Sequence, residues 1–162
     1  MAIQVLVLCT GNSARSQIGE ALLAARGSTR ADGIVSARSA GSRPVARVNP
    51  YAIEVLAAHG ISWTGGVPKS IDDVASDHYD LVITVCDNAR DACPIFPGAH
   101  AQVHWGLPDP ADADLEGPTA TREAFEATYQ ALSARVDALL ALPLESLTAE
   151  ALRESAQRLH GD

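Results

Sequence analysis

Residues 2–16 read AIQVLVLCTGNSARS, an almost unbroken apolar run followed by a loop of small and polar residues. The run Ala2–Leu8 is rich in β-branched residues and predicts a strand that is buried on both faces. After the loop, Gln17–Arg26 carries apolar residues at helical spacing, and Gly27 ends the helix. A buried strand, a loop and a helix in this order predict the first unit of an α/β sheet with parallel strands.

The alternation of strands and helices continues through the rest of the chain. Asn49 and Pro50 give an N-cap and a first-turn signal for a helix over 51–59, and Ser70–Asp73 resembles a capping box. Hydrophobic periodicity predicts further strands at 34–40, 81–85 and 101–105, and helices at 119–142 and 148–159. We therefore expect a three-layer α/β sandwich in which a four-stranded parallel sheet is flanked by helices.

The 162 residues, 47% of them hydrophobic, are enough for one ordinary domain. The sequence contains no internal repeat and no linker that would divide it. Pro143 breaks the long helix, so we assign residues 1–143 to the main part and residues 144–162 to a C-terminal helical extension of the same domain. Two roles for this extension stay open: it pads the core, or it mediates self-association.

The net charge of −8 argues against nucleic acid and anionic membranes as partners. The apolar runs are far too short to span a bilayer and the N-terminus has no signal peptide, so we expect a cytoplasmic protein, acting as a monomer. The charge is unevenly spread, however, because residues 1–50 hold six arginines against Glu20 and Asp32. This local excess of positive charge indicates a site for a small anion.

The loop Cys9–Ser16 has the pattern C-x5-R-S. Its backbone N–H groups can turn inward as an anion nest, with Gly11 free to adopt unusual φ and ψ, and the following helix adds the positive end of its dipole. Arg15 can form a bidentate fork, Ser16 can donate a hydrogen bond to Cys9, and Asn12 can brace the loop. We expect this field to depress the pKa of the Cys9 thiol and make it a nucleophile. The predicted anion-binding residues are Thr10, Gly11, Asn12, Ser13, Ala14, Arg15 and Ser16.

A structural alternative for Cys9 is a buried strand-end cysteine before an ordinary turn. The complete loop pattern between a strand and a helix favours the anion site. The Walker pattern G-x-x-x-x-G-K-[ST] is absent, so nucleotide binding is not indicated. The three cysteines show neither a C-x-x-C pair nor a Cys/His ligand spacing, which argues against a closed disulfide framework and a zinc site.

The other two cysteines, Cys86 and Cys93, follow the third predicted strand and are separated by six residues. In a rigid helix their Cα atoms would lie roughly 10 Å apart, so a disulfide requires this segment to loop or unwind. The intervening residues 87–91 are polar and weakly helical, which suits a switch between a compact reduced form and a looped oxidised form. Two inert core cysteines are the alternative.

Asp109 lies between two prolines in GLPDPA, residues 106–111. A rigid loop is a good mount for a general acid, which has to stay within hydrogen-bond reach of a leaving oxygen. An ordinary turn aspartate is the alternative. We expect the neighbouring His104 and Trp105 to pack under this loop and to take no part in the chemistry.

The segment VLCTGNSARSQ, residues 7–17, resembles the phosphate loop of the low-molecular-weight phosphotyrosine phosphatase superfamily, which includes the thioredoxin-coupled arsenate reductases. The similarity covers roughly residues 3–142. Three features resemble the reductase branch. Gln17 follows the Arg-Ser pair where phosphatases usually carry proline, the C-x6-C pair is similar to the reductases' redox segment, and HWG with DPA is similar to their motif around Asp109.

The resemblance implies an enzyme that reduces arsenate to arsenite, with phosphate and sulfate as competing anions. Cys9 would attack arsenic while Asp109 protonates the departing oxygen; Cys86 would then attack Cys9, and Cys93 would attack Cys86. Electrons would come from thioredoxin, with no tightly bound cofactor. Two rivals stay open: a low-molecular-weight protein tyrosine phosphatase with the same loop, and an oxyanion-binding or redox-sensing module without turnover.

Some members of the superfamily hold a structural potassium ion near the loop. Asn12, Glu20 and Ser39 match part of such a site and are its candidate ligands here. The region 63–73 does not match the rest of that site, and the Lys69 ammonium is placed to take the cation's position. We therefore leave potassium unassigned.

Overall fold

The computed structural model describes residues 3–31, 33–85, 96 and 98–160. Four parallel strands form one sheet in the order β2-β1-β3-β4, with bounds β1 (Ile3–Cys9), β2 (Val35–Gly41), β3 (Tyr79–Thr84) and β4 (Ala99–His104). The described helices are α1 (Arg15–Gly27), α2 (Pro50–Ala58), α3 (Ile71–Val74), α5 (Pro118–Leu140) and α6 (Ala149–Arg158), with 3-10 turns η1 (Pro110–Glu116) and η2 (Leu144–Ser146). Of these helices, none is long and apolar enough to cross a membrane.

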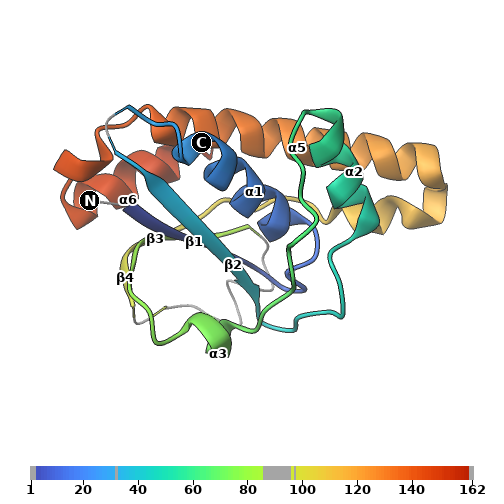
Figure 1. The fold of residues 1–162 in the computed structure, drawn as a ribbon, viewed down its shortest axis with the longest axis horizontal. Helices are drawn as coiled ribbons and strands as arrows, with labels where there is room; N and C mark the ends of the chain where they lie inside the picture. The colour runs from blue at the N-terminus through green and yellow to red at the C-terminus, as the bar shows by residue number, and fades with distance from the viewer. Residues whose placement is uncertain (1–2, 32, 86–95, 97, 161–162) are drawn as a thin grey trace.

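The helices lie on both sides of the sheet. Figure 1 shows α1, α2 and α5 above the strands and the short α3 below them. On the upper side α1 packs against β1, β2 and α5, and α2 packs against α5. The expected three-layer α/β sandwich with a four-stranded parallel sheet is confirmed.

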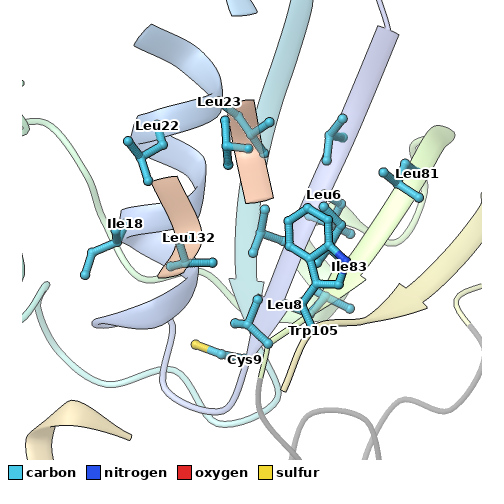
Figure 2. Close-up of a cluster of buried hydrophobic side chains, with 14 of the residues drawn as sticks. Leu6, Leu8, Cys9, Ile18, Leu22, Leu23, Leu81, Ile83, Trp105 and Leu132 are labelled. Atoms are coloured by element: carbon cyan, nitrogen blue, oxygen red, sulfur yellow. The ribbon is translucent and has the colours of Figure 1, made fainter. Parts of the chain in front are cut away.

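The core forms where β1, the central part of the sheet, meets α1 and α5. Val5, Leu6, Val7 and Leu8 are all buried, as the unbroken apolar run of this strand predicts. Figure 2 shows side chains of α1 and α5 packed together beside the sheet, with the sulfur of Cys9 at the end of β1. The apolar strand thus delivers Cys9 to the edge of the sheet where parallel strands end, the usual place for a ligand in open α/β folds.

Local signals predict several element boundaries well. The Asn49 side chain accepts a hydrogen bond from Tyr51 N, and Ser70 forms the capping box that opens α3. The start of α1 differs from the expectation, because the helix begins at Arg15 instead of Gln17. Ala14 is the N-cap residue and makes no side-chain cap bond, so the sequence carries no cap signal there. Arg15 and Ser16 therefore belong to the first helical turn.

The C-terminal extension packs against the sheet. α6 lies against β4 and β3, with Leu152 and Ala156 buried. Trp105 Nε1 donates to Ala156 O at 2.9 Å, and the Gln157 amide bonds both the N–H and the C=O of His104 at 2.9 and 2.8 Å. Of the two roles left open, the contacts fit padding of the core.

Candidate active site

Cys9, the last residue of β1, is 2% exposed, and its Sγ lies 2.8 Å from Ser16 Oγ in the first turn of α1. The thiol thus has the hydroxyl partner predicted for it. A pocket of about 300 Å³ opens beside the cysteine. It is lined by Cys9, Thr10, Gly11, Ser13, Ala14, Arg15, Arg43, Val45, Asn49, Asp109 and Ala111.

Four carbonyl groups of the loop accept hydrogen bonds from the backbone of the segment 42–49, which follows β2. The backbone bonds are Ser42 N to Cys9 O at 3.2 Å, Arg43 N to Thr10 O at 2.8 Å, Val45 N to Gly11 O at 3.1 Å, and Asn49 N to Ser13 O at 2.9 Å. Every described peptide bond is trans, so each N–H points opposite to the carbonyl of its own peptide unit. With these carbonyls bonded to the segment 42–49, the N–H groups on the opposite side of the same peptide units are the donors that an anion nest would use.

Asn12 braces the loop through its side chain, as predicted. It is fully buried, and its Nδ2 donates to Ser16 Oγ and Ser39 Oγ at 2.8 Å each, while its Oδ1 accepts from Lys69 N at 2.8 Å. Its φ of +52° is left-handed, whereas Gly11, the residue that we expected to be free for unusual φ and ψ, does not have a positive φ. Asparagine tolerates left-handed backbone better than most residues, and the three bonds hold it there.

Arg15 brings a guanidinium to the pocket and is 8% exposed. Its Nη1 donates to Leu107 O at 2.9 Å, and its Nη2 lies 3.4 Å from Asp109 Oδ2. Its Nε is buried and has no hydrogen-bond partner among the described residues. A buried donor without a partner costs free energy, and an oxyanion in the pocket would provide the missing acceptor.

Asp109 caps η1, where its Oδ1 accepts from Ala111 N at 3.0 Å. This bond and the flanking prolines fix the side chain so that Oδ2 faces Arg15 across the pocket. The structure thus brings Asp109, which is distant in sequence, to the same cavity as Cys9 and Arg15. Ser16 does not line the cavity but lies behind it, against Cys9. Trp105 is buried and bonds α6, in agreement with the structural role expected for it.

One pocket wall was missed by the sequence reasoning. Arg43, Val45 and Asn49 come from the segment 42–49, whose backbone donors leave no signature in the side chains. The excess of arginine in residues 1–50 indicated a positive charge at the site, but it did not identify Arg43 as a pocket residue. Three of the other arginines of that region pair with carboxylates outside the pocket: Arg26 with Asp137, Arg30 with Glu145 and Arg38 with Asp77.

A family model described as low molecular weight phosphotyrosine protein phosphatase matches residues 4–155. This chain belongs to that family. The match runs past residue 142 into α6, further than the similarity we expected from the motifs. The family membership agrees with the anion loop, the buried arginine and the aspartate found around one pocket.

Relatives within the family carry a narrower description. An arsenate reductase of Halalkalibacterium halodurans is 36% identical over 110 residues, covering 68% of this chain and 76% of the relative. Arsenate reductase 1 of Bacillus cereus is 39% identical, covering 66% of this chain and 76% of the relative. Both alignments span more than two thirds of the relatives.

The solved structures that this chain resembles also include arsenate reductases. An arsenate reductase in its phosphate-binding state superposes with a TM-score of 0.71 at 27% identity, covering 86% of this chain and 97% of that one. A thioredoxin-dependent arsenate reductase of Corynebacterium glutamicum gives a TM-score of 0.58 at 31% identity, covering 84% of this chain and 62% of that one.

Two predicted site residues, Cys86 and Cys93, lie outside the described residues. The residues just before Cys86 are described. β3 ends at Thr84, and Val85 N donates a hydrogen bond to Leu8 O at 2.9 Å, beside the end of β1. The relay assigned to these cysteines stays a prediction.

The candidate potassium ligands are close together. Ser39 Oγ donates to Glu20 Oε1, and Asn12 donates to Ser39. The Lys69 ammonium lies 3.9 Å from Glu20 Oε1. Its replacement of a cation stays a prediction. Among the described residues, no group of three or more His, Cys, Asp and Glu side chains is placed to hold a metal ion.

Proposed function

We propose that this protein is an arsenate reductase, which converts arsenate to arsenite with electrons from thioredoxin. The observation that carries the proposal is the single pocket that is lined by Cys9, the residues of its loop, Arg15 and Asp109. The arsenate reductases among the relatives support this substrate, and the thioredoxin-dependent enzyme supports this electron donor. We place the reaction in the cytoplasm, where thioredoxin keeps thiols reduced.

Binding uses charge and oriented hydrogen bonds. Arsenate takes the place at the loop where the N–H groups of residues 10–16 converge, and the Arg15 guanidinium forms the charge-assisted contacts. The Nε of Arg15 and its Nη2 then bond the anion, while Nη1 stays on Leu107 O. Phosphate and sulfate fit the same donors and compete.

The first chemical step forms a bond between sulfur and arsenic. The Cys9 thiolate attacks As(V), an As–O bond breaks, and Asp109 supplies the proton with which that oxygen leaves as water. Asp109 Oδ2 faces the pocket for this purpose, since Oδ1 is bound to Ala111 N. Ser16 Oγ, 2.8 Å from Cys9 Sγ, stabilises the thiolate by donating a hydrogen bond.

The second step reduces arsenic. Cys86 attacks the sulfur of Cys9, a Cys9–Cys86 disulfide forms, and the electron pair of the S–As bond stays on arsenic, which leaves as arsenite. Cys93 then attacks Cys86 and frees Cys9. The resulting Cys86–Cys93 disulfide accepts two electrons from the dithiol of thioredoxin, which closes the cycle.

A coupled assay tests the proposal. NADPH oxidation with thioredoxin and thioredoxin reductase should depend on arsenate for the wild type and fall to background for Cys9→Ser, Cys86→Ser and Cys93→Ser. Undiminished steady-state turnover in Cys93→Ser would contradict the relay. Glu154→Ala, which changes an exposed residue of α6 outside the pocket, is the control and should keep the wild-type rate.

The rival activity is hydrolysis of aryl phosphates, because the same loop and acid suit a phosphate ester. The residues that line the described pocket include no aromatic side chain, and its rim presents Arg43, Val45 and Ala111. A phenyl ring therefore lacks a ring to stack on, which favours a bare oxyanion as substrate. Efficient dephosphorylation of phosphotyrosine that survives replacement of Cys86 and Cys93 would favour the phosphatase.

A further inference from the structure

Gln17 is a buried polar residue that the proposed chemistry does not use. It lies in α1 directly after Ser16 and is 0% exposed. Its amide is bonded at both ends: Nε2 donates to Asn12 O at 3.1 Å, and Oε1 accepts from Trp63 Nε1 at 2.9 Å. The side chain therefore joins the anion loop to the segment around Trp63, which is 46 residues further along the chain.

Gln17 provides the hydrogen-bond donor for a loop carbonyl, Asn12 O, that does not bond to the segment 42–49. The carbonyls of Cys9, Thr10, Gly11 and Ser13 each accept from a backbone N–H of the segment 42–49. The Asn12 carbonyl accepts from the Gln17 side chain instead. Ser13 lines the pocket and Gln17 does not. Since Asn12 O and the N–H of Ser13 belong to one trans peptide unit, a carbonyl held toward Gln17 leaves the Ser13 N–H on the opposite side of that unit.

This peptide unit needs support more than its neighbours do. Asn12 has a φ of +52°, a conformation that costs a non-glycine residue free energy and persists only when its surroundings hold it. The Asn12 side chain is held by Ser16, Ser39 and Lys69. Gln17 holds the main chain of the same residue.

Trp63 fixes the amide of Gln17 in turn. The indole N–H donates to Oε1, which leaves the NH₂ group facing Asn12 O. The segment also packs closely on the pair: a Cβ at Gly66 would lie 2.6 Å from Trp63 Nε1 and 2.7 Å from Gln17 Oε1. The chain can close over Gln17 this tightly only because residue 66 is glycine.

We propose that Gln17 is a positioning residue for oxyanion binding, which aims the Ser13 N–H at the anion, and that Trp63 acts through Gln17. The proposal rests on the proposed function in so far as the Cys9–Ser16 loop binds an oxyanion. Neither residue touches the anion. Both are needed to keep one of its donors in place.

Phosphate binding by the full chain tests this without any turnover. The dissociation constant for inorganic phosphate is measured by calorimetry for the wild type, Gln17→Met, Trp63→Phe and the double variant. Methionine keeps the bulk of glutamine and removes both bonds, so we expect binding to weaken on the order of tenfold, the effect of losing one hydrogen bond to a charged ligand. Trp63→Phe should weaken it by a smaller factor, and the double variant should match Gln17→Met.

Gln157→Met is the matched control. It removes a glutamine amide that also makes two bonds to the main chain, at His104, away from the anion loop. It should lower stability in urea but leave the phosphate affinity unchanged. Wild-type affinity in Gln17→Met, or losses that add in the double variant, would overturn the proposal. A wild-type protein that binds phosphate but does not reduce arsenate would refute the proposed function. The phosphate affinities of the variants would still test the role of Gln17.

Discussion

At the mouth of the pocket, Arg43 places a positive charge that no chemical step uses. Its backbone N–H is bonded to Thr10 O, and its exposed side chain lines the cavity. Arg47, four residues later, is also exposed but does not line the cavity. The two residues therefore separate the effect of a charge at the mouth from that of overall charge.

We expect Arg43→Ala to raise the KM for arsenate by roughly three- to tenfold with little change in kcat, because a mouth charge attracts the anion but makes no bond that strengthens in the transition state. The effect should shrink as ionic strength rises. Arg47→Ala is the control and should change KM much less. Equal effects of the two substitutions in steady-state kinetics would refute a specific role for Arg43.

Lys69 lies beside the candidate potassium ligands. Its ammonium lies 3.9 Å from the mostly buried Glu20 carboxylate, so we propose that it replaces a bound cation. The Tm of the wild type should then be the same in sodium and potassium buffers. Lys69→Ala should lower the Tm, and potassium should restore part of the loss by occupying the oxygen cluster of Asn12, Glu20 and Ser39. A wild type that is stabilised by potassium but not by sodium would contradict this.

The sequence predicted most site residues but not the reason for their geometry. Cys9, Arg15 and Ser16 follow from one local pattern. The left-handed residue of the loop is Asn12, whose side chain is held by Ser39 and Lys69, 27 and 57 residues away, and no local pattern indicates it. Sequence gives the composition of a loop, whereas the conformation of each residue depends on partners that only the fold supplies.

Helices α2 and α5 are joined by a contact between His59 and the Glu126 carboxylate, whose pKa is lowered in the folded protein. His59, the C-cap residue of α2, stacks on Tyr129 of α5 with ring centroids 3.9 Å apart, and its Nε2 lies 3.0 Å from the Glu126 carboxylate. Hydrogen bonds from Gln130 and then His59 lower the pKa of Glu126 below its ordinary value of 4.5. A carboxylate with a lowered pKa stabilises the fold where it is ionised.

This contact predicts a dependence of stability on pH. Because the pKa of folded Glu126 lies below that of the unfolded chain, its contribution is complete above the unfolded value and is lost as pH falls through the folded one. The side chain is 44% exposed, so we expect less than about 1 kcal/mol at pH 7. In urea titrations from pH 7 to pH 3, the difference between the wild type and Glu126→Gln should shrink toward acid. The exposed Glu123→Gln should show no such trend; the same trend there would rule out the contact as the cause.

The order and type of the elements were predictable from sequence because their signals are local. The Asn49 cap, the capping box at Ser70 and the apolar run of β1 each act within a few residues. The docking of the segment 42–49 under the anion loop was not predictable. It depends on backbone donors, which every non-proline residue carries, and on a sheet that brings the ends of β1 and β2 together.

At the level of the whole molecule, the question is whether α6 unfolds together with the rest of the chain or separately from it. We propose that residues 144–162 belong to the same domain as residues 1–143. Leu152 is buried, whereas Glu154 on the same helix is exposed. Leu152→Ala should therefore lower the free energy of unfolding by about 2–4 kcal/mol in a single transition. Glu154→Ala should change it little. A separate early transition in urea, or no loss for Leu152→Ala, would show that the helix is dispensable.

The charge of the whole molecule fits the pocket. The chain carries −8 overall, yet Arg15 and Arg43 line the cavity and Asp109 is the acidic side chain among its lining residues. A small anion is attracted only near the pocket, while polyanions are repelled elsewhere. The parallel sheet creates this contrast by gathering the loops after its strands at one edge.

In the proposed reaction, one chain reduces one arsenate with its own thiols. The most direct measurement uses reduced Cys93→Ser, an excess of arsenate and no other reductant. We predict one arsenite released per chain and, by mass spectrometry of the trapped protein, a Cys9–Cys86 disulfide. Absence of arsenite, or arsenite released without that disulfide, would contradict the proposed reaction.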